Sequence, residues 1–401
     1  MIWVWGGVMV VFLALYVMMI LWFMRGWRLF LHSGLGESLP RAVELYPSVD
    51  LEKKEILLSV VVAARNESGR MKPLLEALTT QDFGGSFMGS LEVVWVDDES
   101  MDGTAALVEA YAKEHPELMF RVMRRNGMDS FPPHKKGAVA MGISAAQGEW
   151  ILVTDADCVP SPGWCSTMMT CLARNQSIEF VAGPVRLNPC GSIWLRSQAV
   201  EYMSLNAIAA SSIALGQPII SNGGNMAFRR STFLRLNPYA DNMNHPGGDD
   251  DLLMHRIALT FGPDSVVFCA DPKAMVDTPP MGSLKDLMQQ RIRWVSKQSA
   301  YPVPWVSAVL MAVWFMQAMI VIGLLGGIVG WGGIAWISLS AWLVKGMMDG
   351  LFTQRAARFY GIRAEWWLLV LTHLWYLPYT LFAGFMGYRG QFEWKGRLYR
   401  T

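Results

Sequence analysis

Two groups of acidic residues in this chain could bind a metal ion and accept a proton. Asp155 and Asp157 stand one residue apart at the end of an apolar run. In an extended chain both carboxylates point the same way and can reach one hard cation. A divalent ion there would bridge the oxygens of a diphosphate and neutralise it as a leaving group. Acidic pairs also arise by chance, but the position at the end of a strand favours a metal site.

The second acidic group, Asp249, Asp250 and Asp251, follows two glycines. Neighbouring like charges make a carboxylate a better proton acceptor, which suits a general base. We predict that Asp250 deprotonates the hydroxyl of an acceptor and that Asp249 lies beside it. A solvated acidic turn is the alternative interpretation.

Further polar residues suit the binding of a nucleotide. Asp98 follows an apolar run, and its carboxylate could accept the imide N–H of a uracil or a similar base. Asn66 and Glu67 end another run in the same manner. Lys135 could approach a phosphate as a point charge. The alternatives are a helix cap in the segment that contains Asp98 and a solvated basic loop around Lys135.

A third motif combines an amide, an arginine and an indole. Gln290 and Arg293 are three residues apart and therefore share one face of a helix. Arg293 could hold diphosphate oxygens, and Trp294 offers a flat surface for an acceptor sugar or a lipid head group. A tryptophan anchored at a membrane interface beside basic residues is an equally good interpretation of this motif.

The elements that must position these residues predict an α/β domain. Short apolar runs at residues 57–62, 91–96 and 150–153 are typical of strands that are buried on both faces. Helical patterns at residues 73–80 and 104–114 separate these runs, so a mostly parallel sheet is expected. Ligands bind beyond the carboxyl ends of such strands, where the polar clusters should converge.

The composition is that of a mixed membrane protein. Apolar residues make up 52% of the 401 residues and charged residues only 17%. Residues 2–24 are uncharged and long enough to span a bilayer, and Arg25 and Arg28 follow at once, which predicts a cytoplasmic continuation. A cleaved signal peptide is disfavoured, because the apolar stretch is too long and lacks small residues at its end.

The C-terminal third becomes apolar again. Residues 284–298 predict an amphipathic helix at the cytoplasmic interface, and candidate spans follow at 304–326, 331–350 and 365–388. Four spans would leave the basic tail outside, against the positive-inside rule. Either one segment is re-entrant or interfacial, for which the last segment is the strongest candidate, or the rule fails in this chain.

These patterns predict six regions. They are an N-terminal transmembrane helix (1–27), a juxtamembrane linker (28–55), a cytoplasmic catalytic domain (56–282), an interface helix (283–302), transmembrane helices (303–388) and a basic tail (389–401).

The composition argues against other classes of protein. A net charge of +1 gives no electrostatic field that would favour binding of nucleic acid. The five cysteines form no metal-binding spacing and are expected to be reduced thiols. The polar residues Lys345, Asp349 and His373 are too few for a transporter.

With these motifs in this order, the chain resembles the membrane-embedded glycosyltransferases of family 2, the group that includes cellulose, hyaluronan and chitin synthases. The resemblance covers roughly residues 57–297 and is carried by residues 60–67, 96–104, 135, 154–157, 223–228, 248–250 and 290–294. It implies a GT-A fold, a nucleotide-diphosphate sugar donor, a Mg²⁺ or Mn²⁺ ion and inversion at the anomeric carbon.

The resemblance also implies roles for individual residues. The donor nucleotide would lie against Ala64, Asn66, Glu67, Asp98, Lys135 and Asp155. The metal ion would bind Asp157 and Asp155. Asp250 would be the base beside Asp249, where the family more often has Glu-Asp, and the acceptor and diphosphate would meet Gln290, Arg293 and Trp294.

The expected function is transfer of a sugar, with a UDP-sugar as the favoured donor, to a lipid-linked or membrane-proximal acceptor at the cytoplasmic face of the inner membrane. Few spans argue against a processive polysaccharide synthase, which is the alternative; an inactive scaffold is a weaker one. An oligomer or a partner protein would be needed to build a wide channel. Residues 193–215 could contact lipid or belong to the buried core.

Overall fold

The computed structural model describes residues 2–34, 58–82, 91–126, 131, 134–188, 191–240, 247–395 and 397–400. These residues form two compact units. The sheet unit comprises Leu29–Asn188 and Ser212–Pro279, and the helical unit comprises Met1–Arg28, Pro189–Ser211 and Pro280–Thr401. Most of the predicted linker at 28–55 lies outside the described residues.

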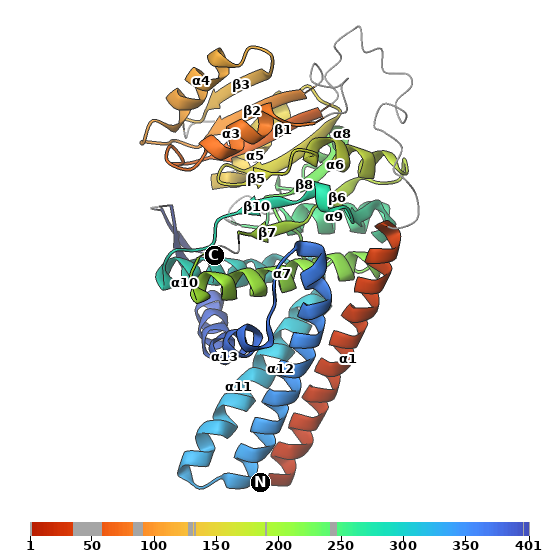
Figure 1. Cartoon of the computed structure of the whole chain (residues 1–401), viewed down its shortest axis with the longest axis vertical. Coiled ribbons are helices and arrows are strands. Elements are labelled where there is room, and N and C mark those ends of the chain that lie inside the picture. The colour runs from red at the N-terminus through yellow and green to blue at the C-terminus, as the bar shows by residue number, and fades with distance from the viewer. Residues whose placement is uncertain are drawn as a thin grey trace. The chain divides into compact units, whose positions relative to one another are not determined.

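The sheet unit is built around a seven-stranded sheet in the order β3-β2-β1-β4-β8-β6-β9 (Figure 1). Strands β1, β2, β3 and β4 pair in parallel, as do β6 and β9, and only β8 runs antiparallel to its neighbours. The strands are β1 (Leu58–Ala64), β2 (Leu91–Asp97), β3 (Met119–Arg124), β4 (Trp150–Asp155), β6 (Phe180–Ala182), β8 (Met226–Arg229) and β9 (Val266–Phe268). The predicted mostly parallel α/β class is therefore confirmed.

Helices and a second sheet complete this unit. The second sheet has the order β5-β10-β7, with β5 (Val159–Pro160), β10 (Val276–Thr278) and β7 (Val185–Leu187). The helices are α3 (Lys72–Thr79), α4 (Thr104–Glu114), α5 (His134–Ala145), α6 (Trp164–Ala173), α8 (Arg230–Leu236) and α9 (Asp251–Phe261). Valine-rich β1 and β2 are almost wholly buried, because helices cover both faces of the parallel sheet.

The register of the central strands aligns their polar ends. Ala63 of β1 pairs with Asp155 of β4, and Ala64 pairs with Asp97 of β2. The residues that follow β1, β2 and β4 therefore emerge along one edge of the sheet, as the sequence predicted from the parallel order.

The helical unit contains the long apolar helices. Its elements are α1 (Ile2–Gly34), α7 (Ile193–Ala214), α10 (Leu284–Ser296), α11 (Pro304–Gly326), α12 (Gly332–Tyr360), α13 (Trp366–Tyr388) and the hairpin of β11 (Gln391–Trp394) and β12 (Arg397–Arg400), with the ends of α1 and α7 belonging to the sheet unit. Three helices of the described chain, α1, α11 and α13, are long and apolar enough to cross a membrane. Most of α7 is buried, so core packing rather than lipid contact accounts for its apolar residues.

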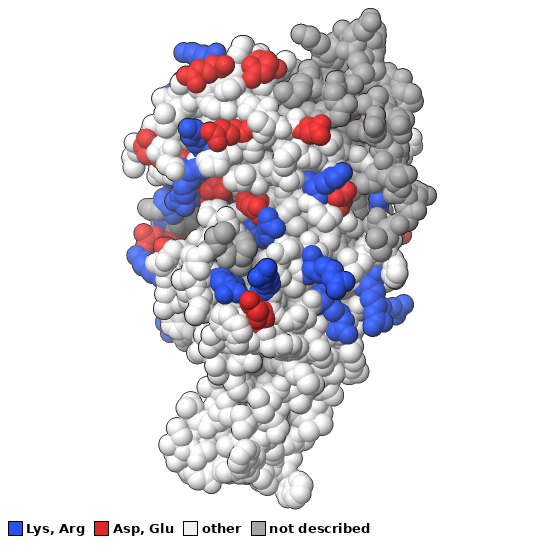
Figure 2. All heavy atoms as spheres, viewed as in Figure 1, with Lys and Arg blue, Asp and Glu red and all other residues white. Residues whose placement is uncertain are grey.

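Helix α12 fails the apolarity criterion but packs along α1 for its whole length. Contacts join Trp5 to Ser338, Tyr16 to Asp349 and Trp27 to Tyr360. Residue numbers rise together along both helices, so α1 and α12 are parallel. Figure 1 shows α1, α11 and α12 side by side, and on the face seen in Figure 2 the lower part of this bundle carries no charged side chain.

A charged cluster accounts for the lower apolarity of α12. The Lys345 ammonium lies 2.6 Å from Asp349 and is almost fully buried between the rings of Tyr16 and Tyr376, at 5.0 and 5.1 Å from their centres. The Tyr16 hydroxyl donates to the other Asp349 oxygen at 2.5 Å. A buried charge inside an apolar bundle is tolerated when it is paired in this way.

Helix α13 takes a different path from the other three. It begins beside Gly350 of α12, and its middle contacts α11, where Thr380 donates to Gln317 at 2.6 Å. Its end lies against Val295 of α10, the helix that immediately precedes α11. The β11–β12 hairpin continues this contact, because Phe392 and Tyr399 pack with Ile292 of α10. Both ends of α13 therefore lie towards the end of the bundle at which α11 begins.

Candidate active site

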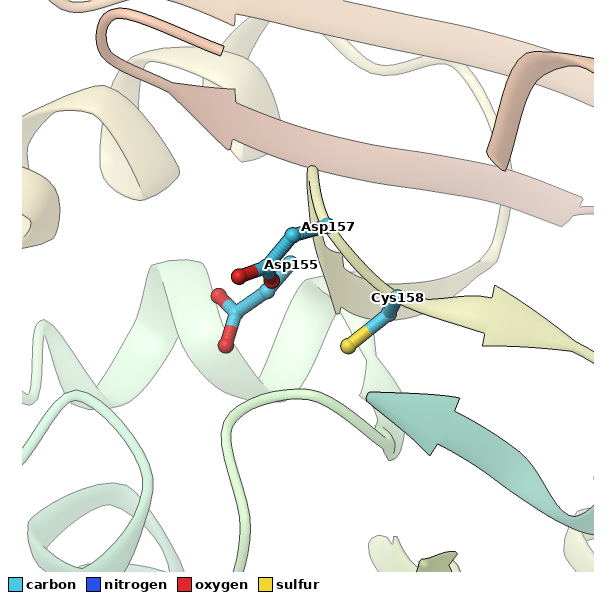
Figure 3. A group of neighbouring side chains, drawn as sticks. All are labelled: Asp155, Asp157 and Cys158. Atoms are coloured by element: carbon cyan, nitrogen blue, oxygen red, sulfur yellow. The ribbon is translucent and has the colours of Figure 1, made fainter. Parts of the chain in front are cut away.

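The carboxylates of Asp155 and Asp157 lie close together at the end of β4. Together with the thiol of Cys158, they offer three ligand atoms that lie within 4.8 Å of one another. Figure 3 shows the two carboxylates turned toward each other, with the sulfur set to one side. Asp155 is the last residue of β4, and buried Ala156 separates the two acids. The strand end thus places two oxygen ligands where the sequence predicted a metal ion.

These residues fit a hard divalent cation better than a soft one. Mg²⁺ and Mn²⁺ prefer carboxylate oxygens, which Asp155 and Asp157 supply. Burial, together with the charges of Asp155 and Asp157, raises the pKa of the Cys158 thiol well above its ordinary value. The two carboxylates are therefore the ligands that this site offers to a hard cation.

Lys135 connects the β4 carboxylates to the second acidic group. Its Nζ atom lies 2.6 Å from Asp155 Oδ1 and 3.0 Å from Asp249 Oδ2. Burial alone would lower the pKa of Lys135, but the two carboxylates raise it above its ordinary value. The side chain reaches this position from the first turn of α5, since His134 precedes it with a positive φ of 70°. Residues from β4, α5 and the loop before α9 therefore meet at one point.

Asp250 stands at the start of α9, next to this meeting point. Its Oδ1 accepts from the Asp251 amide at 2.8 Å and its Oδ2 accepts from the Gly223 amide at 3.2 Å. Two amide donors orient its carboxylate, and capping of the helix is one of its roles. Asp251 is fully buried and accepts from the Ser221 amide at 2.7 Å. The loop at 221–223 is thus tied to the start of α9.

Two glycines give the acidic cluster its space. A Cβ atom on Gly223 would lie 3.3 Å from both Lys135 Nζ and Asp249 Oδ2. One on Gly224 would lie 3.2 Å from the Cys158 sulfur and 3.6 Å from Asp155 Oδ2. The Gly223-Gly224 pair was part of the sequence resemblance, and the structure gives it a steric reason.

The residues predicted for the nucleotide lie along the same edge of the sheet. Asp98 follows β2, is buried, and accepts from Arg125 at 3.0 Å. Arg125 also donates to the His134 carbonyl at 2.8 Å, which links the end of β3 to the start of α5. Sequence reasoning missed Arg125, because a single arginine after a strand carries no motif.

Asn66 and Glu67 form the turn that follows Ala64 at the end of β1. Asn66 has a φ of 53°; its amide donates to Ser100 and its side-chain oxygen accepts from the Met101 amide, each at 2.9 Å. The Glu67 amide donates to Thr104 at 2.9 Å. These bonds hold the turns after β1 and β2 together, which gives both residues a structural role beside the predicted binding role.

The third motif lies on α10 of the helical unit. Gln290, Arg293 and Trp294 are partly exposed, whereas Arg291 between them is buried. Arg291 forms an ion pair with Glu201 of α7, in which Nη2 and Oε2 are 3.1 Å apart. The one-face arrangement of Gln290 and Arg293 follows from the helix, as predicted.

A match to a known protein family covers most of the sheet unit. Residues 59–235 match the family described as Glycosyl transferase family 2. The chain carries a glycosyl transferase family 2 domain. The resemblance drawn from the order of the motifs is thereby confirmed, and the matched segment contains Asp98, Lys135, Asp155, Asp157 and the Gly223-Gly224 pair.

Curated relatives of this family 2 domain include enzymes of two kinds. The Dictyostelium discoideum dolichyl-phosphate beta-glucosyltransferase is 30% identical over 128 residues, which is 31% of this chain and 37% of that protein. The Staphylococcus epidermidis poly-beta-1,6-N-acetyl-D-glucosamine synthase is 22% identical over 239 residues, 59% of this chain and 53% of that protein. The chain thus matches about a third to a half of the length of these relatives.

A solved structure extends the likeness to the whole chain. A mannosyltransferase from Pyrobaculum calidifontis, in complex with GDP-Man and Mn²⁺, has a TM-score of 0.56 and covers 95% of this chain and 99% of its own. At 17% identity, this likeness concerns the fold alone. With the family match, it confirms the predicted GT-A-like class.

Proposed function

We propose that the protein is an inverting glycosyltransferase that moves a sugar from a nucleotide diphosphate to an acceptor held at a membrane. The observation that carries the proposal is the meeting of Asp155 and Asp249 at Lys135, with Asp157 and Asp250 adjoining. Carboxylates for a metal ion and a separate carboxylate for a proton are what this transfer requires.

In the proposed reaction, Asp250 takes the proton of the acceptor hydroxyl as that oxygen attacks the anomeric carbon. The bond from this carbon to the diphosphate oxygen breaks, and the nucleoside diphosphate leaves with the bonding electrons. Asp155 and Asp157 would hold Mg²⁺ or Mn²⁺, which would neutralise charge on the diphosphate. We assign Asp98, Asn66 and Glu67, which share one edge of the sheet, to the base and ribose of the donor.

A lipid-linked acceptor is favoured by the helical unit and by the named substrate of the dolichyl-phosphate relative. A processive polysaccharide synthase is the second candidate, because one relative makes poly-beta-1,6-N-acetyl-D-glucosamine. The donor we favour is a UDP-sugar, with GDP-mannose as the competitor suggested by the fold relative.

We further propose that α1, α11 and α12 cross the inner membrane and that α13 enters and leaves on one side. Apolarity alone would choose α13 over α12. The packing favours α12, because it runs parallel to α1 while α11 and α12 form a tight hairpin. Four exposed arginines lie near the C-terminal ends of α1 and α12, namely Arg25, Arg28, Arg355 and Arg358. Because basic residues favour the cytoplasmic side of a membrane, this side is then cytoplasmic.

The test of sugar transfer uses the purified full-length protein in lipid nanodiscs with Mn²⁺ or Mg²⁺. UDP-glucose, UDP-N-acetylglucosamine and GDP-mannose are supplied with a polyprenyl phosphate or diacylglycerol, and nucleoside diphosphate and labelled lipid are measured. Asp250→Asn should lower the rate by about 10²- to 10⁴-fold with donor binding retained. The asparagine still caps α9, so the fold is kept.

Asp157→Ala should lose the metal-dependent part of donor binding, while Glu76→Gln on the exposed face of α3 should behave as wild type. Full turnover by Asp250→Asn would remove Asp250 from the mechanism. A long polymer in place of a singly modified lipid would favour the synthase, and no turnover with any donor and acceptor would favour the inactive scaffold.

A further inference from the structure

Arg291 differs from its neighbours on α10 in being buried. Its side chain is 6% exposed, as is that of Glu201 on α7. The residues that we assign to the acceptor and diphosphate are partly exposed around it: Gln290, Arg293 and Trp294. Burying a guanidinium costs free energy unless its charge is paired and its N–H groups are hydrogen-bonded.

All three nitrogen atoms of the Arg291 guanidinium are engaged. Nε and Nη2 donate to the two carboxylate oxygens of Glu201 at 3.2 and 3.1 Å. Nη1 donates to Oε1 of Gln290 at 2.6 Å. Glu201 also accepts from the hydroxyl of Tyr379 on α13. The planar fork of arginine suits this pattern, which the single ammonium of lysine could not reproduce.

These bonds fix what Gln290 can offer to a ligand. Because an arginine has only donors, the amide oxygen must face Arg291 and the amide NH₂ group must face away. Gln290 then presents its NH₂ group to a ligand as a hydrogen-bond donor, which suits a phosphate or hydroxyl oxygen. Arg291 also fixes Trp294: its guanidinium carbon lies 4.2 Å from the centre of the indole ring.

We propose that Arg291 is a positioning residue, which sets Gln290 as a donor and holds the Trp294 ring in place for the acceptor substrate. The proposal rests on the proposed function. Glu201 anchors the guanidinium from α7, and the ring of its neighbour Tyr202 lies 6.0 Å from that of Trp294. Arg291 itself touches neither substrate nor metal in this role.

A purely structural ion pair is the competing explanation, and an apolar replacement separates the two. Buried ion pairs can often be exchanged for apolar residues of similar volume with little loss of stability. The triple variant Arg291→Met, Glu201→Leu, Tyr379→Phe should therefore keep its thermal midpoint. It should nevertheless lose about 10²-fold in kcat/KM for the acceptor, because Gln290 and Trp294 are free to turn. The KM for the nucleotide sugar should change little.

A second measurement needs no turnover. In protein labelled with 5-fluorotryptophan, the ¹⁹F resonance of Trp294 is identified by its loss in Trp294→Phe. It should move in the triple variant and stay in place in Lys285→Gln, which alters an exposed residue of the same helix.

A folded triple variant with wild-type acceptor kinetics, or with an unmoved Trp294 resonance, would overturn the positioning role. If the wild-type protein transfers no sugar, the proposed function fails, while a moved resonance still supports the contact between Arg291 and Trp294.

Discussion

At the residue scale, Lys135 is the side chain that assembles the acidic cluster. The sequence predicted that it approaches a phosphate, and the structure places its ammonium between Asp155 and Asp249. The two acids are distant in sequence but close in the fold. Without the lysine between them, their like charges would repel each other. One cation therefore holds a strand end and a loop together.

Replacing Lys135 with methionine should reveal that repulsion. We expect a loss of about 1–3 kcal/mol in the free energy of unfolding at pH 7, because two carboxylates lose their partner. The loss should be undiminished at neutral pH and should shrink only above about pH 10, where the wild-type lysine begins to lose its charge. Thermal unfolding of both proteins between pH 7 and 11 measures this difference.

The raised pKa of Lys135 sets this pH dependence. Its pKa is raised above the ordinary value, so its stabilising effect is fully present below about pH 10 and is lost only above that. Lys72→Met, which removes an exposed lysine, is the control and should show no pH-dependent loss. A loss for Lys135→Met at pH 7 no larger than that for Lys72→Met would contradict the repulsion.

Residue types and their order were sufficient to predict the acidic cluster, but not its cationic partners. Asp155, Asp157 and Asp250 stand in short motifs at the ends of elements. Arg125 and Arg291 act through partners up to 90 residues away, and no local pattern distinguishes them from other arginines. Their burial was the decisive information, and only the structure supplies it.

At the scale of elements, the loop that contains Gly223 and Gly224 packs closely against the carboxylates, and the lack of side chains on these glycines leaves space for them. Asn225 follows it, is fully buried, and donates to the carbonyls of Pro184 and Ala274 at 2.9 and 2.8 Å. The loop is therefore anchored at a buried, hydrogen-bonded residue, and a side chain added on the loop would press on the acidic cluster.

Gly224→Val should weaken metal-dependent donor binding by at least about tenfold and cost about 1–3 kcal/mol of stability. Isothermal titration with Mn²⁺ and the nucleotide sugar measures the first effect, and thermal unfolding the second. Gly69→Ala is the matched control, because its Cβ would meet no atom within 4 Å. Wild-type binding by the valine variant would show that the loop does not limit the site.

Elements with a clear apolar pattern were predictable, whereas β3, α6, α9 and the short strands were not. Continuous apolar runs identified β1, β2 and β4, and an amphipathic pattern identified α10. The strands β6, β8 and β9 have only three or four residues, too few for a recognisable period, and β8 runs antiparallel for reasons of tertiary packing.

At the scale of the whole molecule, membrane crossings follow from packing more than from apolarity. Composition gave four candidate spans and an unresolved position for the basic tail. The contacts of α13 with α12, α11 and α10 offer a solution, since both of its ends lie towards the end of the bundle where α11 begins. Hydropathy could not show this, because α13 is apolar in either arrangement.

The three-crossing arrangement predicts a cytoplasmic tail. Green fluorescent protein fused after the last residue should fluoresce, and alkaline phosphatase fused there should be inactive. Fusions in the turn between α11 and α12, at Gly330, should behave in the opposite way. An active phosphatase at the tail would show that α13 crosses the membrane, and four crossings would replace three.

The cluster of Tyr16, Lys345 and Asp349 limits how this bundle can evolve. Loss of Asp349 alone would leave an ammonium without its counter-charge amid apolar side chains, and loss of Lys345 alone would leave a carboxylate there. Descendants of this sequence should therefore keep both charges or lose both together, with Tyr16 becoming replaceable by phenylalanine once Asp349 has gone. Substitutions in the first helix of the chain are thus coupled to substitutions in a helix more than three hundred residues later.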